Sequence, residues 1–103
     1  MRLQVTSHHI DLSEELKDFV RRRVHFALGR FSGRIKAVSI RLADVNGPRN
    51  GVNNRCDIRI SAGPGGSVII REGRENIYSA LAHALDRAAQ AVQRKLSLQR
   101  AVV

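Results

Sequence analysis

The fold is decided by residues 76–98, which read NIYSALAHALDRAAQAVQRKLSL. Their apolar residues recur at intervals of three and four, the period of an α-helix with one buried face. This apolar stripe consists of Ile77, Leu81, Ala84, Leu85, Ala88, Val92 and Leu96. Asn76, just before it, is a residue type that caps helix N-termini. We therefore predict a helix that begins after Asn76 and ends near Leu98, followed by a frayed tail.

A second amphipathic pattern lies upstream and predicts a helix over residues 13–31. Its apolar stripe consists of Leu16, Phe19, Val20, Val24, Ala27 and Phe31. Residues 11–15 supply capping side chains and carboxylates, which favour the positive end of the helix dipole. Ser32 and Gly33 end the pattern.

Four further segments alternate apolar and polar residues with a period of two, which is typical of half-buried strands. They are residues 1–6, 38–43, 55–61 and 68–71. The turn formers of residues 46–53 predict a long mobile loop, and residues 63–66 predict a tight turn. The order is therefore β-α-β-β-β-α. It predicts an α+β two-layer sandwich, in which two helices pack on one face of a mixed four-stranded sheet within a single domain, residues 1–103.

The charge composition indicates a polyanionic partner. The chain has 18 Lys+Arg against 9 Asp+Glu, a formal net charge of +9. Only Lys17, Lys36 and Lys95 are lysine, so the other 15 of the 18 cations are arginine. Because the planar guanidinium group binds two phosphate oxygens at once, nucleic acid is the leading candidate partner.

Other classes of protein are disfavoured by what the sequence lacks. No apolar run approaches the ~20 residues that cross a bilayer, and the N-terminal residues do not resemble a signal peptide. We therefore predict a cytoplasmic protein with no membrane partner. Cys56, the only cysteine, alternates in phase with Ile58 and Ile60 and is predicted to be a core residue. The histidines lack metal-ligand spacing and no catalytic constellation stands out, so we predict no metal, cofactor, small-molecule substrate or catalytic residue.

The predicted helices place several cations away from their apolar stripes. Arg21 and Arg22 point outward, whereas Arg23 falls within the stripe, so its head must reach an edge or the partner helix. Helices lying side by side would form a basic groove for an RNA backbone. The predicted RNA-binding residues are Arg21, Arg22, Arg23, Arg87, Arg94 and Lys95. A plainer interpretation is solvated helix surface, partly paired with acidic neighbours; the surplus of cations favours phosphate binding.

The order of elements and several short motifs resemble the hibernation-promoting factor family of ribosome-associated translation inhibitors, small bacterial proteins that bind idle ribosomes. The resemblance covers essentially the whole chain. It is carried by residues 3–6, by residues 16–20 and the basic cluster after them, and by Arg34-Ile35. Its strongest part is residues 76–81, Asn-Ile-Tyr-Ser-Ala-Leu, similar to the family's Asp-Met-Tyr-Ala-Ala-Ile and followed by Asp86-Arg87 and Arg94.

The resemblance implies a translation regulator of the stress response, monomeric when free, that docks in the channel of the small ribosomal subunit. Basic residues on both helices would contact ribosomal RNA (rRNA), and mRNA and tRNA would be kept out. Arg22 and Arg23 match the family's paired lysines on the first helix, and Arg87 and Arg94 match lysines on the second. Phe26 stands where the family is often charged, and the longer loop after Asp44 indicates a divergent branch. The C-terminal domain by which longer members pair ribosomes is not expected.

Three alternative functions remain at this stage. A general binder of structured or double-stranded RNA is suggested by the β-β-β-α tail, although such domains present a lysine-rich helix N-terminus and Glu75 gives this one an acidic start. A nuclease with His25 or His83 as general base would need a second catalytic group that the sequence does not offer. A protein-interaction adaptor would bind its partner with weak salt dependence.

Overall fold

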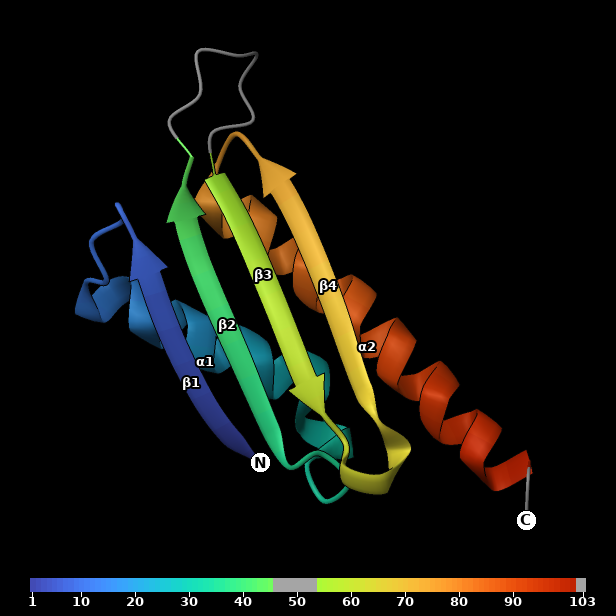
Figure 1. Cartoon of the computed structure of the whole chain (residues 1–103). Helices are drawn as coiled ribbons and strands as arrows, with labels where there is room; N and C mark the ends of the chain where they lie inside the picture. Colours follow the sequence, from blue (N-terminus) through green and yellow to red (C-terminus); the bar gives the residue numbers. More distant parts are fainter. Residues whose placement is uncertain (46–53, 102–103) are drawn as a thin grey trace.

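The computed structural model describes residues 1–45 and 54–101 and has the predicted β-α-β-β-β-α order (Figure 1). The helices are α1 (Glu14–Leu28) and α2 (Ile77–Ala101), and the strands are β1 (Arg2–His8), β2 (Ala37–Asp44), β3 (Asn54–Ser61) and β4 (Ser67–Arg74). Two 3₁₀ turns, η1 (Gly29–Phe31) and η2 (Gly63–Gly65), follow α1 and β3.

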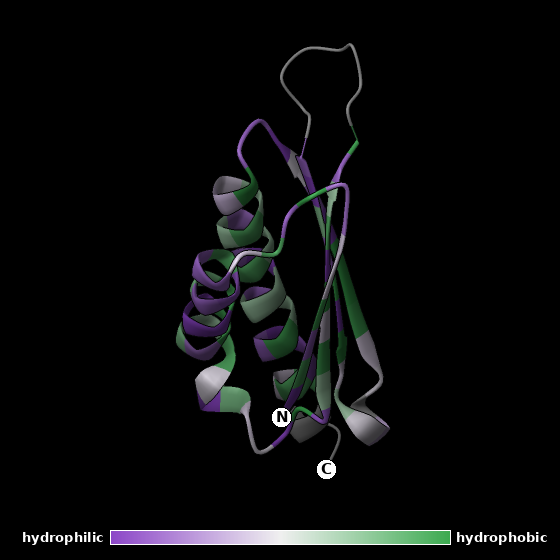
Figure 2. Cartoon of the chain, turned by 90° about the vertical axis from the view of Figure 1, so that its left-hand side faces the viewer, coloured by the Kyte–Doolittle hydropathy of each residue, from purple (hydrophilic) through white to green (hydrophobic). Residues whose placement is uncertain are grey.

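The four strands form one mixed sheet in the order β1-β2-β3-β4. β1 pairs with β2 in parallel, whereas the other two pairs are antiparallel. Parallel neighbours need a crossover connection, and α1 provides it. Both helices lie on the same face of the sheet (Figure 2), which confirms the predicted two-layer α+β sandwich.

The core lies between the sheet and the helices. The inward rows of β2 and β3 match in register, with Val38 opposite Ile60, Ile40 opposite Ile58 and Leu42 opposite Cys56. The helices cover these rows with buried apolar side chains: Leu16, Val20, Val24 and Leu28 of α1, and Ala80, Leu81, Ala84, Leu85, Ala88, Val92 and Leu96 of α2. Cys56 is fully buried, so its predicted place in the core is confirmed.

Several boundaries differ from the predicted ones. β1 extends to His8, α2 extends to Ala101, and the last turn of the first predicted helix is the 3₁₀ turn η1. β4 is twice the predicted length because it pairs with β3 along all of Asn54–Ser61. Its second half, Glu72-Gly73-Arg74, has no apolar alternation that could reveal it. The predicted loop over residues 46–53 lies outside the described residues.

Local signals at the element ends are confirmed. The Ser13 hydroxyl accepts a hydrogen bond from the Leu16 amide at 3.1 Å. The Asn76 side-chain oxygen accepts one from the Tyr78 amide at 2.8 Å, as expected of N-caps. The tight turn between β3 and β4 requires glycine, because Gly63 and Gly66 have positive φ angles of 64° and 89°.

Glu72 of β4 links α2 to the edge strand of the sheet through an ion pair. Its carboxylate accepts from Arg87 of α2 at 2.7 Å and pairs with Arg74 at 2.8 Å. The hydrogen bond from Arg87 is the main reason why the pKa of Glu72 lies below its ordinary value of 4.5, despite partial desolvation. Lys95 of α2 adds a hydrogen bond to the Ser67 carbonyl at 3.2 Å.

A truncation in the core tests the packing of α2. Leu85 is fully buried, whereas Leu98 on the same helix is 62% exposed. We expect Leu85→Ala to lower the free energy of unfolding by about 2–5 kcal/mol. Leu98→Ala, the matched control, should change it by no more than about 0.5 kcal/mol. Urea unfolding followed by circular dichroism measures both, and equal effects would contradict the packing described.

Acid sensitivity tests the contact made by Glu72. Because its folded pKa is depressed, the ionised carboxylate stabilises the fold above the unfolded pKa, and this contribution is lost as the pH falls through the folded value. We expect Glu72→Gln to cost about 1 kcal/mol at pH 7, a figure reduced for the exposure of both arginines. The difference from wild type should shrink below about pH 4.5. A constant difference in urea unfolding from pH 7 to 3 would show that Glu72 stabilises by packing alone.

Candidate nucleic-acid interface

The three predicted residues on α1 have different surroundings. Arg21 is exposed and forms an ion pair with Asp18, so part of its charge is neutralised locally. Arg22 is exposed and has no carboxylate partner among the described residues. Of the two, Arg22 is therefore the one whose charge no described carboxylate compensates.

Arg23 is half-buried, as its position within the apolar stripe required. Its Nε is buried without a hydrogen-bond partner, and its guanidinium carbon lies 5.5 Å from the centre of the Phe26 ring. The head therefore lies over the Phe26 ring of its own helix, and the expectation that it reaches an edge or the partner helix stays a prediction. The flexible stem places the guanidinium over the nearest aromatic face.

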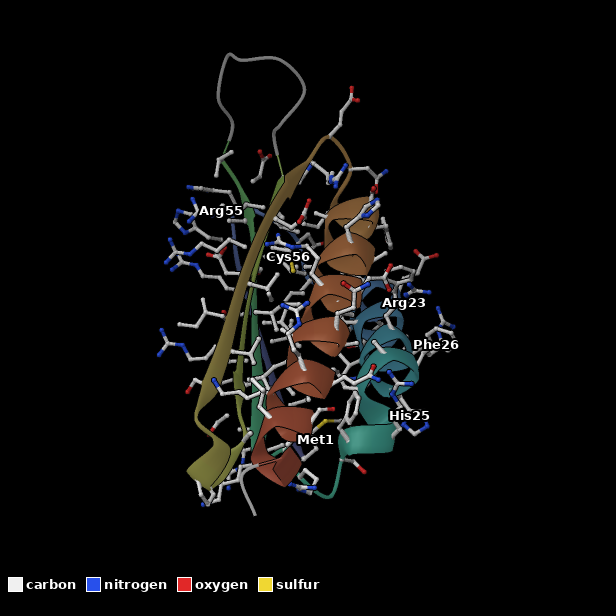
Figure 3. All side chains as sticks on the ribbon, turned by 90° about the vertical axis from the view of Figure 1, so that its right-hand side faces the viewer. Met1, Arg23, His25, Phe26, Arg55 and Cys56 are labelled. Atoms are coloured by element: carbon white, nitrogen blue, oxygen red, sulfur yellow. The ribbon has the colours of Figure 1, made fainter. Side chains whose placement is uncertain are left out.

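Phe26 is the functional candidate that sequence reasoning missed. Its side chain is 79% exposed on α1, beside Arg23 (Figure 3). An exposed aromatic ring next to a cation can stack on an unpaired base while the cation contacts phosphate. The available signal was that Phe26 falls outside the apolar stripe of its helix.

Two of the three predicted residues of α2 contact the sheet. Arg87 and Lys95 contact β4, through Glu72 and the Ser67 carbonyl. Arg94, two turns after Arg87 on the same side of α2, is exposed and has no carboxylate partner among the described residues. Helical spacing gave the face that Arg87 occupies, but not which neighbour lies next to that face.

Two side-chain contacts bridge the first helical segment and α2. Phe19 and Tyr78 pack edge to face, with ring centres 4.7 Å apart. Arg30 of η1 donates a hydrogen bond to Gln93 of α2 at 3.1 Å. These two contacts bridge the helices, and the predicted basic groove between them stays a prediction. We call Arg22, Arg23 and Phe26 of α1, with Arg94 of α2, the helix surface.

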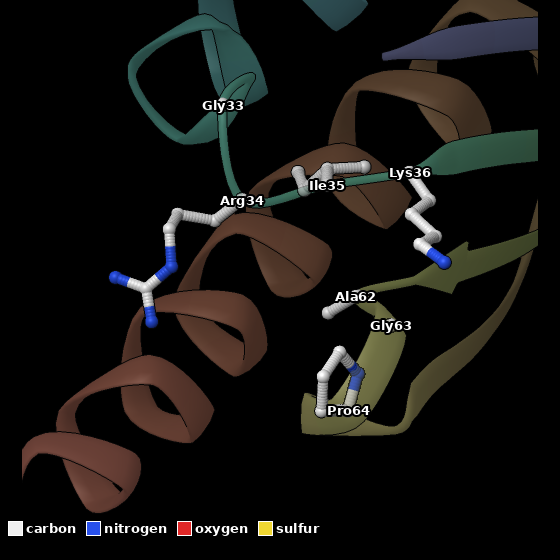
Figure 4. A pocket seen from close by; sticks show the side chains of 7 residues that line it. All are labelled: Gly33, Arg34, Ile35, Lys36, Ala62, Gly63 and Pro64. Carbon is white, nitrogen blue, oxygen red and sulfur yellow. The ribbon is translucent and has the colours of Figure 1, made fainter.

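Two open hollows lie at the end of the molecule where η1, α2 and η2 meet. One, of about 320 Å³, is lined by Arg30, Phe31, Arg34, Gln93, Leu96 and Ser97. The other, of about 300 Å³, is lined by Gly33, Arg34, Ile35, Lys36, Ala62, Gly63 and Pro64 (Figure 4). Arg34 lines both hollows.

The remaining chemistry-bearing groups form no metal centre in residues 1–45 and 54–101. Burial, with smaller contributions from the charges of Asp57 and Glu72, raises the pKa of the Cys56 thiol to about 12. The thiol therefore stays protonated and is a poor nucleophile. Within the same residues, His, Cys, Asp and Glu form no group of three that could hold a metal ion. No helix there is both long and apolar enough to cross a membrane.

Comparisons with known proteins agree with the fold described above. Residues 3–99 match the family model described as sigma 54 modulation protein / S30EA ribosomal protein. No curated protein sequence matches the chain. A ribosomal subunit interface protein from Coxiella burnetii has the same fold, with a TM-score of 0.76 at 15% identity over 94% of this chain and 99% of that one.

The N-terminal domain of Thermus thermophilus Protein Y superposes with a TM-score of 0.71 at 21% identity, over 91% of this chain and 98% of that one. At such low sequence identity, both structures show the fold alone. The family model, in contrast, covers nearly the whole chain, including both helices and all four strands. The chain thus belongs to the sigma 54 modulation protein / S30EA ribosomal protein family, that of the ribosome hibernation-promoting factors.

Proposed function

We propose that this protein is a hibernation factor of the bacterial cytoplasm that binds the small ribosomal subunit through rRNA phosphates. While bound, it keeps mRNA and tRNA out of idle ribosomes. The family supports association with the ribosome. The arginine ligands and the occlusion are the parts that experiment has to test.

The observation that carries the proposal is the unpaired charge on the helix surface. Arg22 and Arg94 are exposed and have no carboxylate partner among the described residues. Each phosphate contact made by such a residue releases condensed counterions, which adds affinity without reading base sequence. Arg23, with an unpartnered Nε, and the exposed Phe26 ring extend this surface. The other predicted ligands, Arg21, Arg87 and Lys95, are secondary because each already contacts a group of this chain.

The proposed mechanism is steric occlusion anchored by charge. A rigid two-layer domain that occupies the mRNA and tRNA path has only to bind, so it requires no catalytic group. An affinity made of phosphate contacts also rises steeply as the salt concentration falls. A general binder of structured RNA would share this salt dependence, but it would not compete with mRNA and tRNA.

Neutralising Arg22 and Arg94 together tests the helix surface. We expect the Arg22→Gln/Arg94→Gln variant to bind vacant small subunits about tenfold or more weakly near 0.15 M salt. The slope of log affinity against log salt should fall by roughly 1.5, because two phosphate contacts are lost. Co-sedimentation with purified subunits over a salt series measures both quantities.

The matched control is Lys17→Gln/Lys36→Gln, which removes the same charge from side chains outside the helix surface. It should bind nearly as well as wild type. If both variants weaken binding equally, only net charge matters and the assignment of the helix surface is wrong. Binding of the wild-type protein that persists at saturating mRNA and tRNA would refute occlusion.

A further inference from the structure

The sheet has one open face, which no helix covers in the described part of the chain (Figure 2). Side chains alternate between the two faces of a strand. The residues that alternate with the buried ones therefore point away from the helices. They are Arg2, Gln4, Thr6 and His8 of β1; Ala37, Ser39, Arg41 and Ala43 of β2; Arg55, Asp57, Arg59 and Ser61 of β3; and Ser67, Ile69, Arg71 and Gly73 of β4. We call this set the sheet surface.

The sheet surface is strongly basic. It carries the five arginines Arg2, Arg41, Arg55, Arg59 and Arg71. The single carboxylate, Asp57, accepts a hydrogen bond from Arg55 at 3.2 Å. Arg41, Arg59 and Arg71 have no carboxylate partner among the described residues. The charge of this surface is therefore mostly uncompensated.

The register of the strands brings three of these arginines close to Asp57. Arg41 and Arg71 flank Asp57 on the neighbouring strands. Arg59 lies two residues along β3, between Ser39 and Ile69. These side chains line a shallow hollow of about 200 Å³. Because neighbouring strands are ~4.8 Å apart, the backbones of Arg41 and Arg71 are separated by roughly 10 Å, so their guanidinium groups can bind separate phosphates.

The chemistry of the sheet surface fits RNA better than it fits a protein. Protein interfaces have a core of aromatic or large apolar side chains. The only large apolar side chain exposed on this surface is Ile69, at 55%, and no Phe, Tyr or Trp lies there. Arginine surrounded by small polar residues is typical of contact with a phosphate backbone.

The sheet surface and the helix surface point in opposite directions. Figure 3 places Arg55 and Arg23 on opposite sides of the molecule, with both layers between them. One RNA segment bound on the helix surface therefore does not reach the sheet surface.

We propose that the sheet surface binds a second RNA segment, so that the domain is held between two segments. The pairing of this site with the helix surface rests on the proposed function, whereas the RNA affinity of the sheet surface does not. The ligand class is a phosphate backbone read without sequence preference.

The test variant is Arg41→Gln/Arg59→Gln/Arg71→Gln, which neutralises the three unpaired arginines. Its matched control, Lys17→Gln/Lys36→Gln/Arg74→Gln, removes three charges outside both surfaces. Arg41→Lys/Arg59→Lys/Arg71→Lys keeps the charge in place. Circular dichroism and urea unfolding establish that all three fold. If the glutamine variant does not fold, the number of duplexes bound by wild type decides, because a single bound duplex overturns the proposal.

The first readout is stoichiometry on a short RNA duplex of about 12 base pairs at low salt, measured by native mass spectrometry. We expect wild type, the matched control and the lysine variant to bind two duplexes per chain. The glutamine variant should bind one. Binding of two duplexes by the glutamine variant, or of only one by wild type, would overturn the proposal.

The second readout is binding to vacant small subunits between about 0.05 and 0.2 M salt. The glutamine variant should bind at least tenfold more weakly near 0.15 M, and its salt slope should fall by about 2. Weaker subunit binding with an unchanged slope and two bound duplexes would assign the sheet surface to a ribosomal protein, against the proposal. If the wild-type protein does not bind small subunits but does bind two duplexes, the proposed function is wrong and the proposal of a second RNA surface is supported.

Discussion

One-sided burial is the constraint on which the rest of the structure depends. The alternating rows of β2 and β3 bury Val38, Ile40, Leu42, Cys56, Ile58 and Ile60 against the two helices. Each strand must then present its remaining side chains to water. Burying one arginine without a partner costs several kcal/mol. Arg2, Arg41, Arg55, Arg59 and Arg71 of the strands accordingly lie on the open face, and Arg22 and Arg94 of the helices are exposed. A basic chain with this fold becomes positively charged on two opposite sides.

The chain has fewer carboxylates than cations, so only some arginines are paired and the others remain available to bind phosphate. Glu72 holds both Arg74 and Arg87, while Asp18 and Asp57 hold Arg21 and Arg55. An arginine that already contacts a carboxylate gives up that contact when it binds phosphate, so its net gain is smaller. Arg87 accordingly links α2 and β4 through Glu72, and we expect it to add less to an RNA surface than an unpaired arginine. Arg22 and Arg94 have no such competing partner in the described chain.

The fold could be predicted from the sequence because its signals are local. Hydrophobic period and capping residues such as Ser13 and Asn76 gave the elements and their order. The candidate site could be predicted only in part. Period assigns Arg87 to a helix face, but only tertiary packing brings Glu72 to that face. The sheet surface was missed because helix periodicity says nothing of the solvent side of strands, where Arg41, Arg59 and Arg71 meet only through register. Phe26 was missed although its place outside the apolar stripe of its helix was a signal.

Charge on two faces changes what the proposed occlusion would require of this domain. A protein that adheres to one RNA wall of a channel can be displaced by a ligand that competes for the free side. A domain that contacts RNA through both layers fills the space between two RNA segments. Its two sets of phosphate contacts belong to one rigid body. Because the helices and the sheet are joined by a continuous apolar core, the second set of contacts forms without further loss of translational freedom, as for linked binding modules. Moderate affinity on each face then suffices for tight binding, and high salt weakens the phosphate contacts of both faces together.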